Sequence, residues 1–163
     1  MNHFGSYSHP YLIRETFDMK KYLLLILFSF YSVHSFASDK LHGSVWKTID
    51  DATNQPRALV RFSQDKNGVL SANIEKILVP SEANKCTMCE GTYKNKSLIG
   101  LTIVKNLKNV GQNKYDKGSI LDPQSDKTYR FSVTVSPDGE KITARGYIGI
   151  SAIGRNQTWY RVK

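Results

Sequence analysis

Alternation of apolar and polar residues is the feature that most constrains the fold of this chain. In residues 128–135 (TYRFSVTV), every second residue from Tyr129 to Val135 is apolar, and polar residues fill the positions between them. Successive side chains of a β-strand point to opposite faces, so this period of two predicts a strand with one buried face. Three further segments show the same alternation: residues 57–62, 70–75 and 142–148.

Turn-forming residues separate the alternating segments. Residues 65–68 (DKNG) and 136–139 (SPDG) each end in a glycine that can adopt the positive φ of a tight hairpin turn. Residues 50–56 predict a longer loop, and residues 115–118 (YDKG) predict a further turn. We therefore expect consecutive strands to pair as antiparallel hairpins.

The strand count favours a barrel or a sandwich. We expect additional strands near residues 43–48, 97–107, 118–121 and 156–162, which gives about eight in total and no convincing helix. Short antiparallel strands at this spacing are typical of β-barrels and β-sandwiches. The predicted fold class is all-β.

The two ends of the domain favour the closed, up-and-down barrel. Trp46 lies on the first expected strand, and Trp159 and Arg161 lie on the last. In a closed meander these strands are neighbours, so Arg161 can stack on the ring of Trp46 as a cation–π pair. The alternative is that both tryptophans are independent anchors of the core.

The N-terminal segment has the pattern of a secretory signal peptide. Two lysines follow Met19, an apolar run covers residues 22–31, and Ser35, Phe36 and Ala37 form a small-x-small cleavage site. The apolar run is about half of the ~20 residues that span a bilayer as a helix. We expect translation to start at Met19 and cleavage to follow Ala37. A single domain of residues 38–163 then remains, periplasmic or secreted and not integral to the membrane.

The charge of the chain is strongly basic. Residues 38–163 carry +8 of the total +9, because residues 1–37 hold three basic and two acidic side chains. Such a charge in a cytosolic protein would suggest nucleic acid as a partner, and export excludes that partner. A solvated basic exterior and contact with anionic envelope surfaces are the two interpretations left.

Cys86 and Cys89 are the only cysteines of the chain. Zinc needs about four ligands, and after cleavage His42 is the only histidine left to join them. A redox dithiol needs its first cysteine at a helix N-terminus, and no helical pattern follows residue 89. In an oxidising compartment the expectation is a Cys86–Cys89 disulfide that stiffens a loop.

The chain resembles the exported bacterial proteins grouped as domain of unknown function 2147. The stretches that carry the resemblance are GSVWKTIDDATNQPRALVRF, the CxxC loop, SLIGLTIVKNLK, GSILDPQSDKTYRFSV and ARGYIGISAIGRNQTWYRV. Together they cover almost all of residues 42–162. The resemblance implies a compact β-barrel similar to lipocalins and other calycins, with no established activity. Lipocalins carry Gly-x-Trp on the first strand, and here the spacing from Gly43 to Trp46 is one residue longer.

Catalysis is not expected from this sequence. A Ser–His–Asp triad would have to recruit His42 at the very start of the domain. Asp50 and Asp51 are adjacent, so on a strand they would point to opposite faces, and in a loop they are turn residues. No catalytic residue, metal or cofactor is therefore predicted.

A barrel of about eight strands can hold one small ligand, and its mouth is lined by loops and strand ends. We expect a small, partly apolar or amphiphilic ligand. The alternative is an interaction module with a filled barrel that binds an envelope protein. The side chain of Arg145 must either face water or, if it points into the barrel, be paired with another group. The candidate ligand-binding residues are Lys47, Asp50, Asp51, Arg145, Tyr147, Arg155 and Trp159.

Overall fold

The structure is a computed structural model that describes residues 1, 39–51, 53–79 and 84–162. The predicted signal peptide of residues 1–37, with its proposed start at Met19, lies almost entirely outside the described residues. The start and cleavage site therefore remain predictions.

Within the described residues the chain forms eight β-strands and one short 3-10 helix. The strands are β1 (Val45–Ile49), β2 (Pro56–Gln64), β3 (Leu70–Ile77), β4 (Thr102–Gly111), β5 (Lys114–Asp122), β6 (Lys127–Val135), β7 (Lys141–Tyr147) and β8 (Gly154–Arg161). The 3-10 helix, η2 (Gly91–Tyr93), lies in the long connection between β3 and β4. The predicted all-β class is confirmed.

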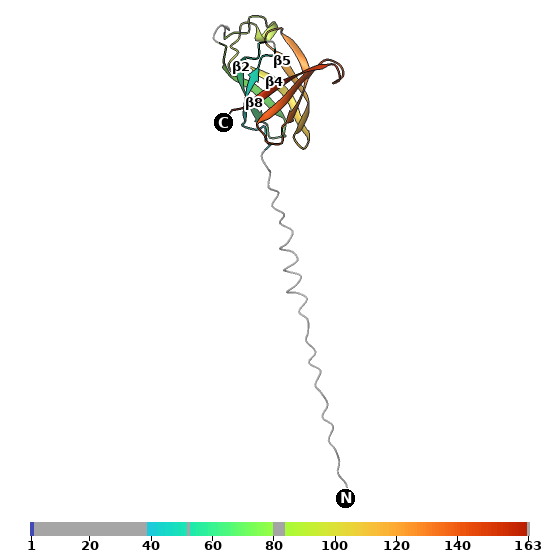
Figure 1. Ribbon diagram of the computed structural model, residues 1–163. Helices are drawn as coiled ribbons and strands as arrows, with labels where there is room; N and C mark the ends of the chain where they lie inside the picture. Colours follow the sequence, from blue (N-terminus) through green and yellow to red (C-terminus); the bar gives the residue numbers. More distant parts are fainter. Residues whose placement is uncertain (2–38, 52, 80–83, 163) are drawn as a thin grey trace. The chain divides into compact units, whose positions relative to one another are not determined.

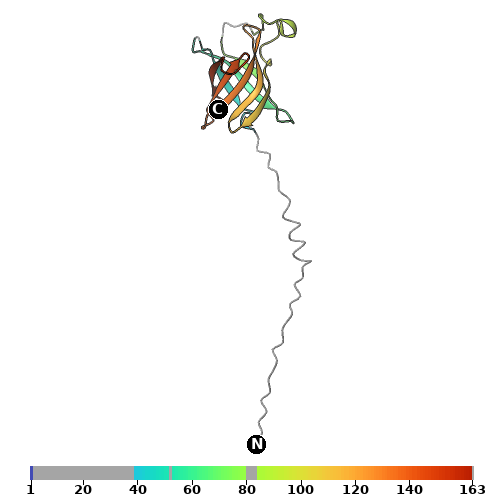
Figure 2. The ribbon, with the colours of Figure 1, turned by 90° about the vertical axis from the view of Figure 1, so that its right-hand side faces the viewer.

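The strands form a closed antiparallel barrel in which each strand pairs with the next and β8 pairs with β1. Figures 1 and 2 show the strands winding round a common axis with a tilt, as closure of a sheet requires. One end carries the short turns β2–β3, β4–β5 and β6–β7. The other end, called here the open end, carries the connections β1–β2, β3–β4, β5–β6 and β7–β8.

The alternation seen in the sequence sets which side chains face the interior. On β6, Phe131, Val133 and Val135 are buried, while Arg130 before them and Thr134 between the last two are exposed. The predicted inward faces of β2 and β3 are buried in the same way. Because the sheet closes on itself, it has an inner and an outer face. Each strand therefore contributes one face to the core and the other to the surface.

Large side chains fill the half of the barrel next to the short turns. These fully or almost fully buried residues are Leu41, Trp46, Phe62, Leu70, Leu107, Tyr115, Val135 and Ile142. The segment before β1 covers this end: Asp39 accepts a hydrogen bond from the Tyr115 hydroxyl at 3.0 Å. Ser44 Oγ accepts a hydrogen bond from Trp46 Nε1 at 2.7 Å, so the buried indole is satisfied. This half of the interior is therefore solid.

The barrel closes at a seam between Trp46 and Arg161. The two residues are partners in the β1–β8 register, and the guanidinium carbon lies 4.5 Å from the centroid of the indole ring. Arg161 Nε also donates a hydrogen bond to the carbonyl of Gly139 at 2.6 Å, so the guanidinium links β8 to the β6–β7 turn. The extra residue between Gly43 and Trp46 does not prevent this contact.

Two local predictions need correction. Residues 115–118 do not form a turn but lie inside β5, where the register with β6 shifts between Tyr115 and Gly118. Lys117 has a positive φ of 64°, and a Cβ on Gly118 would lie 2.9 Å from Leu107 Cδ1. The residues typical of a turn therefore form a bulge and a close packing contact. The real turn follows β4 at Gly111.

The alternation on β7 also ends earlier than predicted. The strand stops at Tyr147, and Ile148 is 67% exposed in the loop that follows.

Removing the guanidinium of Arg161 should destabilise the barrel. We expect Arg161→Met to lower the free energy of unfolding by about 2 kcal/mol, because the cation–π contact and a charged hydrogen bond are lost. Arg61→Met is the matched control: its exposed ion pair with Glu75 should be worth less than about 1 kcal/mol. Urea unfolding of both variants checks this, and equal losses would contradict a special role for the seam.

Tyr115 should make the barrel sensitive to alkali. Burial raises the pKa of Tyr115 above its ordinary value of 10.0. The hydrogen bond to Asp39 and the negative charge of Asp39 raise this pKa further. Above about pH 10 the unfolded tyrosine loses its proton while the folded one keeps it, so the free energy of unfolding falls as pH rises. Between pH 9 and 11 the free energy of unfolding should fall less steeply in Tyr115→Phe than in the wild type. An unchanged slope would contradict this role of Tyr115.

Candidate functional site

A cavity of about 550 Å³ occupies the half of the barrel at the open end. Its wall comes from the ends of the strands and from the connections between them. The residues of the apolar wall include Ala58, Val60, Ile74, Ile77, Leu98, Ile103, Ile120, Leu121, Phe131, Ala144 and Trp159. The volume lies within the range of small-molecule sites, roughly 300–1,000 Å³.

The choice of inward-facing residues explains why this half is hollow. On β7 the inward positions run from Ile142 in the solid half to Ala144 and Gly146 beside the cavity. On β2 they run from Phe62 to Val60 and then to Ala58. On these two strands the inward side chains therefore become smaller toward the open end. Space is left in the middle.

Trp159 forms the boundary between the two halves. Its ring is 2% exposed and lies at tilted angles to Phe62 and Phe131, with ring centroids 6.5 and 6.0 Å away. Its indole Nε1 donates a hydrogen bond to Gln157 Oε1 at 3.2 Å. Gln157 lines the cavity, so its amide places a polar group beside the aromatic floor.

Charged side chains gather at the mouth. Asp50 and Arg57 form an ion pair at 2.6 Å, in which both side chains are largely buried. Asp51, in the β1–β2 connection, and Arg155, at the start of β8, form a second, more exposed ion pair. Lys85, Asp122 and Gln124 also belong to the lining. The cavity therefore combines an apolar interior with a polar, charged entrance.

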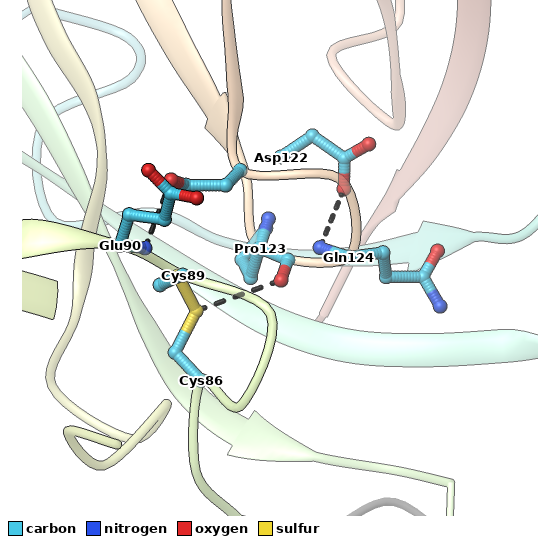
Figure 3. Close-up of a disulfide and its surroundings, with 7 residues drawn as sticks. Cys86, Cys89, Glu90, Asp122, Pro123 and Gln124 are labelled. Atoms are coloured by element: carbon cyan, nitrogen blue, oxygen red, sulfur yellow. Dashed lines mark hydrogen bonds between the residues drawn. A yellow bond between two sulfur atoms is a disulfide. The ribbon is translucent and has the colours of Figure 1, made fainter. Parts of the chain in front are cut away.

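The β3–β4 connection forms part of the rim, and its disulfide holds it in place. Cys86 and Cys89 are linked, and both are almost fully buried. Figure 3 shows the disulfide beside the β5–β6 turn, where Cys86 Sγ lies 3.5 Å from the carbonyl oxygen of Pro123.

A second contact joins the same two segments of the rim. The Glu90 amide donates a hydrogen bond to Asp126 at 2.9 Å. Thr87 and Met88, inside the disulfide loop, line the cavity.

The structure brings part of the predicted site together. Of the candidate residues, Asp50, Arg155 and Trp159 line the cavity, and Asp51 holds Arg155 at the rim. Lys47 lies next to two inward residues of β1, and strand alternation therefore directs it outward. The remaining candidates are the two outward residues at the end of β7.

Arg145 and Tyr147 do not line the cavity. The guanidinium of Arg145 donates hydrogen bonds to the Ser151 carbonyl and to Asn156, so it is held on the outer side of the β7–β8 hairpin. The Tyr147 hydroxyl donates to Asp116 at 3.2 Å. Desolvation and the negative charge of Asp116 raise the pKa of Tyr147 above its ordinary value.

Sequence reasoning missed several residues of the lining. Gln157 and Tyr129 share the inward face of their strands with Trp159 and Phe131, so the alternation alone could have identified them. Arg57 could not be found in this way, because the alternation assigns it to the outer face of β2. Its ion pair with Asp50 directs it to the mouth instead.

A metal site and a membrane-spanning helix each make specific demands on the residues that the structure describes. No cluster of three or more His, Cys, Asp or Glu side chains among them is arranged to hold a metal ion. In the same part of the chain, no helix has the length and apolar character needed to cross a membrane.

The disulfide should contribute modestly to stability. A loop this short gives about 2 kcal/mol by chain entropy, and the cysteines lie outside the strands. We expect Cys86→Ser/Cys89→Ser to stay folded and to lose about that amount in urea unfolding. Thiol titration of the denatured, unreduced wild type should find no free thiol. A titratable thiol, or a double variant that does not fold, would contradict this account.

A solved structure with the same fold is described as "Protein HP1028 from the human pathogen Helicobacter pylori belongs to the lipocalin family". The TM-score is 0.66, and the two chains are 22% identical over 76% of this chain and 83% of the other. A likeness at this identity establishes the lipocalin-like fold alone. A search of curated proteins found no match.

The family comparison agrees with the resemblance seen in the sequence. Residues 44–161, from the start of the barrel to the end of its last strand, match the model of a family described as "Uncharacterized protein conserved in bacteria (DUF2147)". The match spans more than half of the chain and confirms the predicted family. The chain belongs to the bacterial family DUF2147.

Proposed function

We propose that this protein binds a small, partly apolar ligand inside its barrel and carries it in the bacterial cell envelope, in the periplasm or outside the cell. The observation that supports this proposal is the cavity of about 550 Å³ with its apolar interior and charged mouth. The lipocalin-like fold is consistent with such binding. The envelope location rests on the signal-peptide pattern of residues 19–37.

The lining suggests how a ligand would be oriented. An apolar part would contact Phe131 and Trp159 at the floor, where burial from water is the main favourable term. A polar part would lie near Asp50, Arg57 and Arg155, where water and charged partners are available. An amphiphile satisfies both requirements, whereas a wholly polar solute would leave the floor without favourable contacts.

The proposal includes no chemical step. Each of the two adjacent carboxylates at the mouth, Asp50 and Asp51, is engaged by an arginine. These ion pairs hold both carboxylates, so neither is presented to a substrate as a general acid. Binding and release are therefore the activities that this geometry supports best.

The alternative function is an interaction module with a filled barrel. That function requires no internal space, whereas the small residues Ala58, Ala144 and Gly146 leave a cavity in this barrel. The cavity thus favours carriage.

Filling the cavity should weaken binding. We expect wild-type protein to bind the fluorescent probe N-phenyl-1-naphthylamine saturably, with energy transfer from Trp159. Ala144→Leu places a larger side chain in the space and should raise the dissociation constant at least about tenfold. Fluorescence titration measures this change, and circular dichroism checks that the barrel is intact.

Thr143→Leu is the matched control, because it adds a leucine to the exposed outer face of the same strand. It should change the dissociation constant less than about twofold. Gly146→Val is a second filling variant, since a Cβ there meets Tyr129 only at an ordinary 3.7 Å. Absence of saturable binding, or filled variants that bind as tightly as wild type, would contradict the proposal.

A further inference from the structure

The β7–β8 connection presents an unusual apolar surface. Ile148, Ile150 and Ile153 are 67%, 65% and 70% exposed, although isoleucine is among the residues most often buried in proteins. Figure 1 shows this hairpin, in orange to red, projecting beyond the barrel wall. We call residues 148–153 the isoleucine loop. Its apolar side chains make no contribution to the core.

The backbone of the isoleucine loop is held in a defined conformation. Arg145 donates to the Ser151 and Ala152 carbonyls, and Arg130 donates to the Gly149 carbonyl at 3.0 Å. Gly149 adopts a φ of 70°, which disfavours a side chain. Two arginines thus hold three of the loop carbonyls, while the isoleucine side chains are exposed.

Glycine is also required at the base of the loop. A Cβ on Gly154 would lie 2.7 Å from the Gly146 carbonyl oxygen and 2.7 Å from Tyr147 Cβ. The close approach of the two strands there fixes the direction in which the hairpin leaves the barrel.

Basic side chains surround the isoleucine loop. Arg130 and Arg145 contact it directly, and Arg155 follows it on β8. Two acidic groups lie nearby: Asp51, which is paired with Arg155, and Asp116, which accepts a hydrogen bond from the Tyr147 hydroxyl. The chain as a whole carries +9, so the surroundings favour an anionic partner.

We propose that the isoleucine loop docks the protein on an anionic phospholipid bilayer. The isoleucines enter the boundary between headgroups and acyl chains, and Arg130 and Arg145 face the lipid phosphates. Apolar side chains flanked by basic ones are the pattern of interfacial membrane binding. Docking brings the mouth of the cavity to the bilayer, so an amphiphile would have a short path between the bilayer and the cavity. This inference rests on the proposed function, the carriage of an amphiphile.

The size of the surface favours a bilayer over a second protein. A stable protein interface buries about 800 Å² on each partner, with several aromatic or arginine anchors. The isoleucine loop offers one narrow projection with three aliphatic side chains. A projection of this shape suits insertion into a fluid interface, which adapts to it.

Vesicle sedimentation tests the proposal. Full-length protein is expressed with its own N-terminal segment and purified as the host exports it, so that all variants share one N-terminus, confirmed by intact mass. Wild type should bind vesicles of phosphatidylglycerol and phosphatidylethanolamine, bind pure phosphatidylcholine at least about tenfold less, and bind less as salt increases. Ile150→Ser/Ile153→Ser should reduce binding to anionic vesicles at least about tenfold.

The matched control is Val110→Ser, which removes an aliphatic side chain that is 51% exposed at the opposite end of the barrel. It should bind vesicles as wild type does. Equal binding by the double isoleucine variant, or no wild-type binding to anionic vesicles, would overturn the proposal. A wild-type dimer that the double variant converts to monomer would overturn it in favour of self-association.

Insertion can also be observed directly. Ile150→Trp places an exposed indole on the loop, whereas Trp46 and Trp159 are 0% and 2% exposed and give a protected background. Its emission should shift to the blue with anionic vesicles and be quenched by brominated acyl chains. No shift and no quenching would contradict insertion. Probe binding in the cavity is measured without lipid and should be unchanged in Ile150→Ser/Ile153→Ser, so the two proposals fail separately.

Discussion

Closure of the barrel between β1 and β8 is the constraint on which the rest of the structure depends. The contact of the Arg161 guanidinium with the Trp46 ring joins the first strand to the last. The number of strands in a closed sheet limits its internal width, so small inward side chains leave space that the sheet cannot collapse to fill. Large residues fill one half, and small ones at Ala144 and Gly146 leave the other open.

Most of the fold could be predicted from the sequence, because a period of two and the glycine turns are local signals. The failures have physical causes. Gly118 resembles a turn glycine, but its role is to let Leu107 pack against the backbone of β5. Ile148 continues the alternation of β7 beyond the end of the strand, where Gly149 turns the chain. Contacts between strands that are distant in sequence decide both cases.

The site was less predictable than the fold. The sequence predicts that strand ends form the mouth, and Asp50, Arg155 and Trp159 do lie on the lining. The position of Arg145 near a strand end predicts a place in the site, yet its side chain supports the β7–β8 loop outside the barrel. The period of two cannot show where a long, charged side chain ends, because ion pairs and carbonyl contacts determine its direction.

The hollow half of the barrel is central to the functional account, and its natural content is the most direct test. Native mass spectrometry of the protein recovered from the envelope of its own host, under conditions that preserve bound molecules, measures that content. The account predicts a reproducible additional mass of one small amphiphile, released by organic solvent. Repeated recovery of the bare polypeptide mass would contradict it.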